Sequence, residues 1–298
     1  MFRQNAILAM AVGVPLAAAS AFGQAAGWDP LHPRPLNQLR LFLENQFEKT
    51  VTYEDPVWRW VADSVAVGSE PEGPMGRLLW ERRLVLPAGV TRQENATLDM
   101  HLVEHIIDAY HRQNPGDTRF KVIESSLGLH IVPSFVHDED GILVAATSLL
   151  DTRITVPRAA RMPSEHFQAI CAAIARTSGI RVDLADPWLD SVFAPNQAVP
   201  GRGGAARLSA KEKTPYSFEW GASGVPAREA MIELSAASNS TLSWGLLCQP
   251  TLKPQDRWCT LNVVALVVTR PGLDGKPEKV YRTYDRCGKC EFLKRSGQ

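Results

Sequence analysis

The sequence predicts an α+β fold built from several small βαβ-type units, with mixed or antiparallel sheets arranged in two lobes. Three observations support this prediction. A strand-like segment, an amphipathic helical segment and a second short strand follow one another four times along the chain. Many of the 21 prolines lie at the ends of these segments, which is typical of short elements joined by turns. The hydrophobic fraction of 45% and the charged fraction of 21% are those of a globular protein with a substantial core.

The first 23 residues have the pattern of a secretory signal peptide. Arg3 supplies a positive charge, residues 6–18 are apolar, and small residues at positions 19, 21 and 23 offer two cleavage sites. The apolar run is short for a bilayer and contains Pro15, so a transmembrane anchor is the weaker interpretation. We therefore expect an exported protein of the periplasm or the extracellular space, with no membrane span in the mature chain.

Residues 24–145 are expected to form an N-terminal α+β region with two of the units. The first helix is indicated by an apolar stripe at Leu36, Leu39, Leu43 and Phe47. Residues 51–53 follow it as a strand. The second unit begins at residues 83–87, continues as a helix over about 96–111, and ends in a hairpin with strands at 120–123 and 129–132. Residues 137–141 predict a further hairpin turn.

Residues 146–190 are expected to form a third βαβ-type unit. A strand at 154–156 precedes a helix that Pro163 opens and Gly179 ends, and residues 180–184 form the next strand. The apolar stripe of this helix consists of Phe167, Ile170, Cys171 and Ile174.

Residues 191–214 read as a linker, and residues 215–298 as a β-rich C-terminal unit. Its first strand is expected at 216–220, its helix is opened by Pro226, and its next strand is expected at 242–248. Further strands are expected at 258–269 and, after a turn at 273–276, at 279–284.

Two of these units carry a family resemblance. In one, the strand at 216–220 is followed by the helical run 225–234 and by Thr241-Leu242-Ser243-Trp244; in the other, Thr177-Ser178-Gly179-Ile180 forms the turn into a strand. On these residues, the segments at about 150–185 and 216–248 resemble the short N-terminal domain shared by secretins and TonB-dependent receptors. The resemblance implies small modules of the cell envelope that bind other proteins rather than perform catalysis. No secretin pore or outer-membrane barrel sequence follows them, so the modules would stand alone.

The charge balance argues against a nucleic-acid-binding protein. The chain has 32 basic and 32 acidic residues and a formal net charge of zero. A protein that neutralises phosphates needs a basic surface instead. The sequence also lacks a polybasic patch suited to a membrane surface.

The segment His101-Leu102-Val103-Glu104-His105 is the sharpest chemical motif. As H-x-x-E-H it matches the inverted zincin signature, in which two histidines hold zinc and the glutamate activates a water. In a helix, His101, Glu104, His105 and Asp108 share one face, so Asp108 is a candidate third ligand. The alternative is that this face is simply the solvated side of an amphipathic helix. The segment 176–197, where such a peptidase would place a further glutamate ligand, contains no glutamate.

The chain has five cysteines, and export would allow them to form disulfides, because the compartment outside the cytoplasm is oxidising. Cys248 pairing with Cys259, and Cys287 with Cys290, is the simplest scheme, although four cysteines allow three connectivities. Cys171 lies on the apolar stripe of its helix and is expected to be a buried, inert thiol.

Together these features predict an exported cell-envelope protein that acts as a non-catalytic binding or scaffolding module, without a cofactor. Other envelope proteins are its expected partners. The alternative hypothesis is a zinc-dependent hydrolase in which His101, His105 and Asp108 hold the metal and Glu104 is catalytic.

Overall fold

The structure is a computed structural model of the chain. It describes residues 31–57, 82–87, 90, 98–138, 140–185, 189, 217–238, 240–249, 257–271 and 276–281. The predicted signal peptide, the 191–214 linker and the Cys287–Cys290 pair lie outside these residues. The described part contains four α-helices and both parallel and antiparallel strand pairs, so the predicted α+β class is confirmed.

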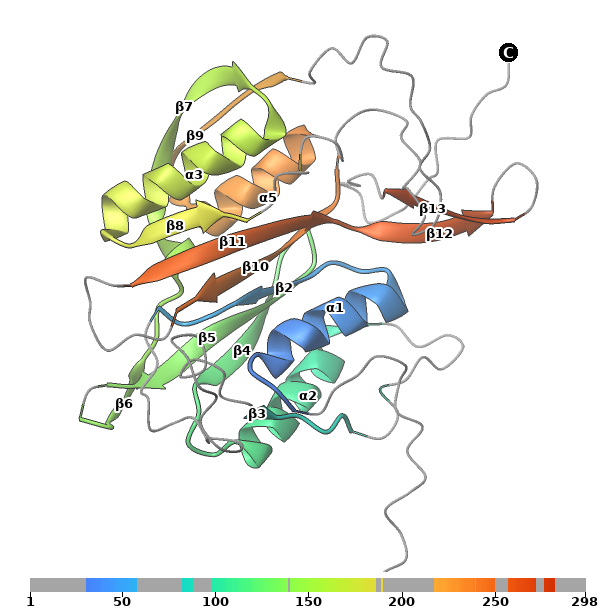
Figure 1. The fold of residues 1–298 in the computed structure, drawn as a ribbon, viewed down its shortest axis with the longest axis vertical. Helices are drawn as coiled ribbons and strands as arrows, with labels where there is room; N and C mark the ends of the chain where they lie inside the picture. Colours follow the sequence, from blue (N-terminus) through green and yellow to red (C-terminus); the bar gives the residue numbers. More distant parts are fainter. Residues whose placement is uncertain are drawn as a thin grey trace, which may run out of the picture.

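The elements fall into two series with the same order (Figure 1). The first series is β1 (Leu31–His32), α1 (Pro35–Phe47), β2 (Val51–Glu54), β3 (Arg82–Arg83), α2 (Met100–Gln113), β4 (Arg119–Glu124) and β5 (Leu129–His137). The second is β7 (Arg153–Arg161), α3 (Pro163–Ser178), β8 (Arg181–Leu184), β9 (Phe218–Pro226), α5 (Ala227–Ala237), β10 (Leu242–Cys248) and β11 (Trp258–Ala265). Between them lie β6 (Leu143–Ala145) and a 3-10 helix (Leu149–Asp151). The strands β12 (Val267–Pro271) and β13 (Pro277–Tyr281) form a final hairpin.

The strand pairing is also repeated, and this makes the two series two copies of one topology. In the first copy β1 pairs with β3, β4 pairs antiparallel with β5, and β2 lies parallel to β5. In the second copy β7 pairs with β9, β10 pairs antiparallel with β11, and β8 lies parallel to β11. Each copy therefore contains two of the four βαβ-type units expected from the sequence. We call the copies the first repeat (residues 31–137) and the second repeat (residues 153–265).

One parallel pairing, between β2 and β10, joins the two repeats into a single sheet. Gly245 lies opposite Tyr53 and Leu246 opposite Glu54, which gives a seven-stranded sheet with the strand order β4-β5-β2-β10-β11-β8 and β6 beside β5. Side chains of a strand alternate between the two faces of a sheet. On β2, Val51 and Tyr53 belong to the core under α1 and α2, whereas Glu54 points to the other face, where Arg228 of α5 binds it.

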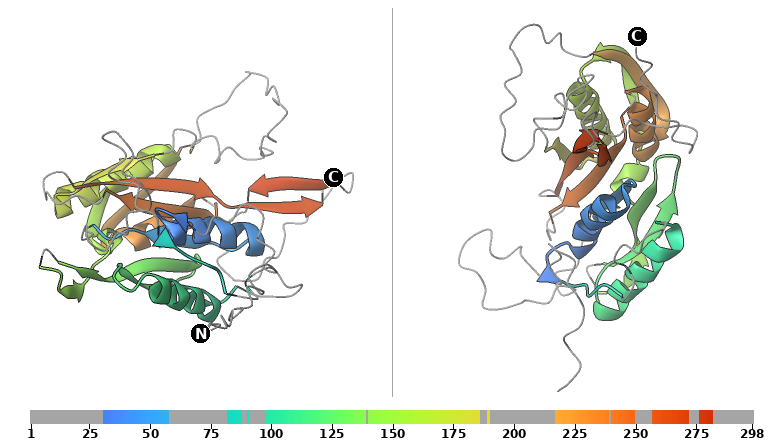
Figure 2. Two further views of the ribbon diagram at one scale, coloured as in Figure 1. Left: turned by 60° about the horizontal axis from the view of Figure 1, so that its bottom comes forward. Right: turned by 90° about the vertical axis from the view of Figure 1, so that its right-hand side faces the viewer.

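The two helix pairs therefore cover opposite faces of the sheet (Figures 1 and 2). Helices α3 and α5 lie between the sheet strands β10, β11 and β8 and the two-stranded β7–β9 ribbon. The apolar stripe predicted for α3 is buried in this core, since Phe167, Ile170 and Ile174 have no exposed surface. Residues 146–190 and 215–298, treated as separate units in the sequence analysis, thus share one core in their described parts.

Local signals explain where the helices begin and end. The Asp99 carboxylate caps α2 by accepting a hydrogen bond from the Leu102 N–H at 2.8 Å. Helix α3 begins at Pro163, and the Glu165 carboxylate accepts a hydrogen bond from the Met162 N–H at 2.8 Å. Gly179 ends this helix with φ of 74°, a left-handed conformation that favours glycine.

The hairpin predicted at 137–141 is present between β5 and β6. The Asp138 carboxylate accepts hydrogen bonds from the N–H groups of Asp140 and Ile142, which fixes the turn. Within the described residues, every helix is too short or too polar to span a membrane.

Candidate functional site

The predicted zinc-binding residues lie on the outer face of α2. The side chain of His101 is 88% exposed, and its Nδ1 lies 3.4 Å from Oε2 of Glu104. His105 and Asp108 are also exposed on this face. Among the described residues, there is no group of three histidine, cysteine, aspartate or glutamate side chains placed to hold one metal ion. The zinc site remains a hypothesis to be tested by metal analysis.

The histidine at the end of the same helix has a structural contact instead. His111 Nε2 accepts a hydrogen bond from the Phe120 N–H at 2.9 Å, so it links α2 to β4. Burial lowers the pKa of His111, which keeps the ring neutral and able to accept this bond.

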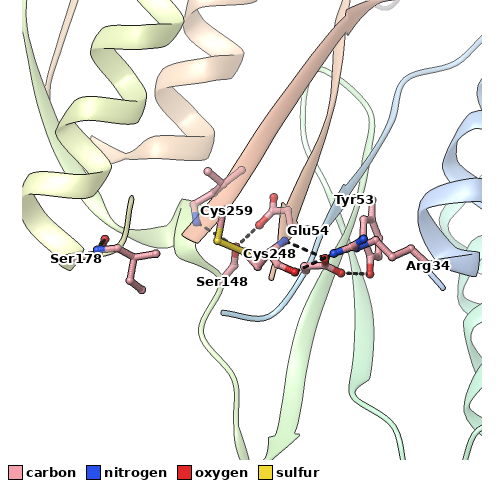
Figure 3. Close-up of a disulfide and its surroundings, with 10 residues drawn as sticks. Arg34, Tyr53, Glu54, Ser148, Ser178, Cys248 and Cys259 are labelled. Carbon is pink, nitrogen blue, oxygen red and sulfur yellow. Dashed lines mark hydrogen bonds and ion pairs between the residues drawn. A yellow bond between two sulfur atoms is a disulfide. The ribbon is translucent and has the colours of Figure 1, made fainter. Parts of the chain in front are cut away.

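The cysteine pair Cys248–Cys259 is bonded, as the sequence predicts. The two residues lie directly opposite each other on β10 and β11, with an S–S distance of 2.07 Å (Figure 3). Cys171 is free and buried in the core of the second repeat, and burial raises the pKa of its thiol to about 12. A thiol with so high a pKa is an inert core residue rather than a nucleophile.

Charged residues for which the sequence predicts no role join the two repeats. Arg228, in the first turn of α5, donates from Nε to Glu54 Oε1 at 2.8 Å and from Nη2 to Glu54 Oε2 at 2.7 Å. Its Nη1 donates to Asp151 Oδ1 at 2.6 Å, and the Ser148 hydroxyl donates to Glu54 Oε2. Glu54 has no exposed surface. Burial lowers the pKa of Arg228, but the bonds and charges of Glu54 and Asp151 outweigh it and raise the pKa overall.

A second carboxylate, that of Asp55 just after β2, ties this strand to the disulfide residue Cys248. Asp55 Oδ2 lies 2.7 Å from Nε of Arg34 and accepts the Cys248 N–H at 3.0 Å. Arg34 Nη2 in turn donates to the Cys248 carbonyl at 2.9 Å. The Tyr53 hydroxyl donates to the other carboxylate oxygen of Asp55. These contacts fix the end of the β2–β10 pairing, where the two repeats meet.

A third contact between the repeats starts from a buried ion pair within α1. Arg40 of α1 lies 3.5 Å from Glu44 and donates from Nη1 to the Ser243 hydroxyl of β10 at 2.7 Å. Burial raises the pKa of Glu44 to about 7, and the Arg40 charge offsets only part of that rise. Both side chains are almost completely buried.

His130 on β5 is the centre of a buried hydroxyl network. Its Nε2 lies 2.7 Å from the Ser125 hydroxyl and its Nδ1 lies 2.8 Å from the Thr52 hydroxyl. The ring stacks on Trp244 of the second repeat with centroids 5.4 Å apart. Burial, together with the Arg228 charge, lowers the pKa of His130 to about 3.

This network has the distances of a nucleophile and its base, but not their chemistry. A general base works best with a pKa near the working pH, and a value of about 3 makes His130 a very weak one. Its orienting partner is a hydroxyl rather than a carboxylate, and Ser125 Oγ already accepts the Leu127 N–H at 3.1 Å. The geometry is that of a neutral histidine satisfied by two hydroxyls.

A groove of about 600 Å³ opens at Ser126, the residue that follows Ser125. Its walls come from both repeats: Ser126 in the β4–β5 turn, Trp220 and Gly221 on β9, and Ile232, Glu233 and Ala237 on α5. Trp220 is largely buried and also contacts the ring of His166, at 5.4 Å between centroids. Glu233 is the exposed carboxylate of the lining. We refer to this feature as the α5 groove.

His166 lies in the first turn of α3, where a polar side chain usually caps the helix or faces solvent, but here it faces the core. The ring is fully buried, and its Nε2 lies 2.9 Å from the Phe218 carbonyl of β9. The reason is that the β7–β9 ribbon covers this part of α3, a contact between distant segments that helical periodicity cannot reveal.

Comparison of the chain with protein-family models, with curated proteins and with solved structures finds no match. Its function is therefore inferred from the geometry of its own residues.

Proposed function

We propose that the protein is exported to the cell envelope and acts there as a non-catalytic module that binds another protein through the α5 groove. The groove is the observation that carries the proposal. It offers an aromatic side chain, small residues and a single carboxylate in an open depression of about 600 Å³. Such a surface suits an apolar side chain of a partner with a basic residue next to it.

The contacts between the repeats support a preformed binding surface. The Arg228 ion pairs hold the first turn of α5 against β2, while the helix continues to Ile232 and Glu233 at the groove. A surface that is ordered before binding loses less entropy when the partner arrives.

The buried polar groups make their hydrogen bonds within the fold, and this also favours a binding role over catalysis. Glu54, Asp55 and His130 are each satisfied by contacts within the fold. The resemblance of both halves of the second repeat to envelope modules that bind proteins points in the same direction.

Site-specific photocrosslinking tests the proposal. A photoreactive phenylalanine analogue placed at Glu233, in the full chain expressed in its own host, should give a discrete crosslinked product with an envelope protein. The matched control is Glu229, which is exposed on the same helix one turn earlier and does not line the groove. Equal products at both positions, or none at Glu233, would contradict the proposal. Fractionation of the same cells tests export separately, since a cytoplasmic chain with an intact leader argues against an envelope role.

A further inference from the structure

In the described part of the chain, strand β6 has a neighbouring strand on one side only. Among the described residues it pairs only with β5, through the register Phe135–Ala145, Val136–Val144 and His137–Leu143. The flanking hydrogen bonds run from the Asp138 N–H to the Ile142 carbonyl and from the Ala146 N–H to the Ser134 carbonyl. Hydrogen-bonded positions alternate along an antiparallel ladder. The backbone groups of Val144 therefore face β5, and those of Leu143 and Ala145 point to the open edge.

The side chains on this hairpin are unusually apolar for an exposed surface. Seven large hydrophobic side chains are exposed in the described part of the chain, and four of them lie here: Phe135, Ile142, Leu143 and Val144. The edge from residue 142 to residue 147 contains neither a charge nor a proline. Proteins usually protect a free edge with these residue types, so an edge without them is suited to pair with another strand.

The edge sequence is complementary to itself when two copies run antiparallel. With Val144 opposite Val144 of the second copy, Leu143 lies opposite Ala145 and Ile142 lies opposite Ala146. Each large side chain then faces a small one, and β-branched valines meet at the centre. The outward N–H and carbonyl groups of Leu143 and Ala145 satisfy each other across the same axis.

Charge selects the antiparallel arrangement. Asp138 and Asp140 lie in the turn that precedes β6, and Asp140 is exposed. A parallel pairing would place these carboxylates beside their copies, and like charges in this position repel. In the antiparallel pairing the two acidic turns lie at opposite ends of the contact.

We propose that the protein forms a homodimer in which the β6 edges of two copies pair antiparallel around Val144, joining their seven-stranded sheets. The hairpin lies at the periphery of the sheet, away from α3 and α5 (Figure 1). The dimer contact therefore leaves the α5 groove free, and it does not depend on the proposed function.

Sedimentation velocity of the full processed chain over micromolar to millimolar concentrations tests the dimer. A contact made by one short strand of each copy is small and therefore weak, so the fraction of dimer should rise with protein concentration. Leu143→Lys places a charge beside the axis and should leave a monomer at every concentration. Leu41→Lys is the matched control, because Leu41 is a similarly exposed leucine on α1, and this variant should dimerise like the wild type. Thermal midpoints show that each variant is folded.

Cysteine crosslinking tests the register. In a chain with Cys287→Ser and Cys290→Ser, the variant Val144→Cys should oxidise to a disulfide-linked dimer, because residue 144 faces itself across the axis. Ile142→Cys should crosslink much less, since residue 142 faces Ala146 of the second copy. A wild type that stays monomeric, a Leu143→Lys dimer, or stronger crosslinking at 142 than at 144 would each overturn the proposal. If the protein stays monomeric but binds an added extended peptide at β6, the edge pairs with a strand of another protein, and the homodimer proposal is wrong.

Discussion

Arg228 and Glu54 form a bidentate ion pair that connects the first turn of α5 in the second repeat to the end of β2 in the first. Both bonds are shorter than 3 Å, and Glu54 is fully buried. A buried carboxylate is costly without a partner, so the position of the two repeats depends on this arginine. The pair lies beside the β2–β10 contact and helps to hold the two similar units in one continuous sheet.

Removal of this arginine should strongly destabilise the fold. Arg228→Ala leaves the Glu54 charge buried and unpaired, and we expect a loss of about 3–5 kcal/mol in the free energy of unfolding. Urea unfolding monitored by tryptophan fluorescence measures it. Arg158→Ala is the control, because its ion pair with Glu219 is exposed and its loss should change stability by no more than about 0.5 kcal/mol. If Arg228→Ala is as mild as the control, the pair does not hold the repeats together.

The stability of the protein should depend on pH through His130. The folded pKa of about 3 lies below 6.5, the ordinary pKa of a histidine, so between these values the unfolded chain binds more protons. The stabilising contribution of neutral His130 is complete above pH 6.5 and is lost as pH falls toward 3. His130→Gln should remove this dependence, which approaches about 1.4 kcal/mol per pH unit within the window. Denaturant unfolding at successive pH values provides the comparison.

Glu44 supplies a control of opposite sign. Its folded pKa of about 7 lies above 4.5, the ordinary pKa of a glutamate, so between these values the folded state binds more protons than the unfolded chain. Stability should fall as pH rises from 4.5 to 7, and Glu44→Gln should flatten that part of the profile. If the two substitutions change the slope of stability against pH in the same direction, these pKa shifts of His130 and Glu44 are wrong.

The disulfide between β10 and β11 should contribute to stability, whereas Cys171 should not react. Reduction of Cys248–Cys259 reopens a loop with a sequence separation of 11 residues, and chain entropy predicts a loss of about 2–3 kcal/mol. Cys171→Ala is expected to leave unchanged the difference in unfolding free energy between the oxidised and the reduced protein. Alkylation of the native protein followed by peptide mapping tests the thiol, because labelling at Cys171 before unfolding contradicts its burial.

The repeated units were predictable because their signals are local. The apolar stripe at Phe167, Ile170 and Ile174 has helical spacing whatever packs against it, and Gly179 ends the helix through its own backbone. The pairing of β10 with β11 was also predictable, because two strands that are close in sequence usually pair as a hairpin. The ends of α3 and the 137–141 hairpin therefore appear where the sequence places them, whereas α2 begins at Met100, after its Asp99 cap, rather than at about residue 96.

The contacts between the repeats could not be predicted in the same way. No local pattern indicates that β2 lies beside β10, because the two strands are separated by almost the whole fold. Glu54 belongs to no motif, and the run 225–234 that contains Arg228 gives this arginine no role. Only their positions, at the end of a buried strand and in the first turn of a helix, indicate a special role. The α5 groove also depends on tertiary packing, since Ser126 and Trp220 are brought together by it.

The outer face of α2 provides the test between the two functional hypotheses. Replacing His101 and His105 together by alanine should change the free energy of unfolding by no more than about 0.5 kcal/mol, because both side chains are exposed. His111→Ala should lower the free energy of unfolding by more than the double substitution does, because His111 accepts a hydrogen bond from the Phe120 N–H. Metal content of protein purified without a histidine tag should be substoichiometric. A bound zinc would behave differently, since its loss removes several kcal/mol of binding or the activated water. One zinc per chain that disappears in the double variant together with a hydrolase activity would replace the binding-module proposal with the zinc hydrolase.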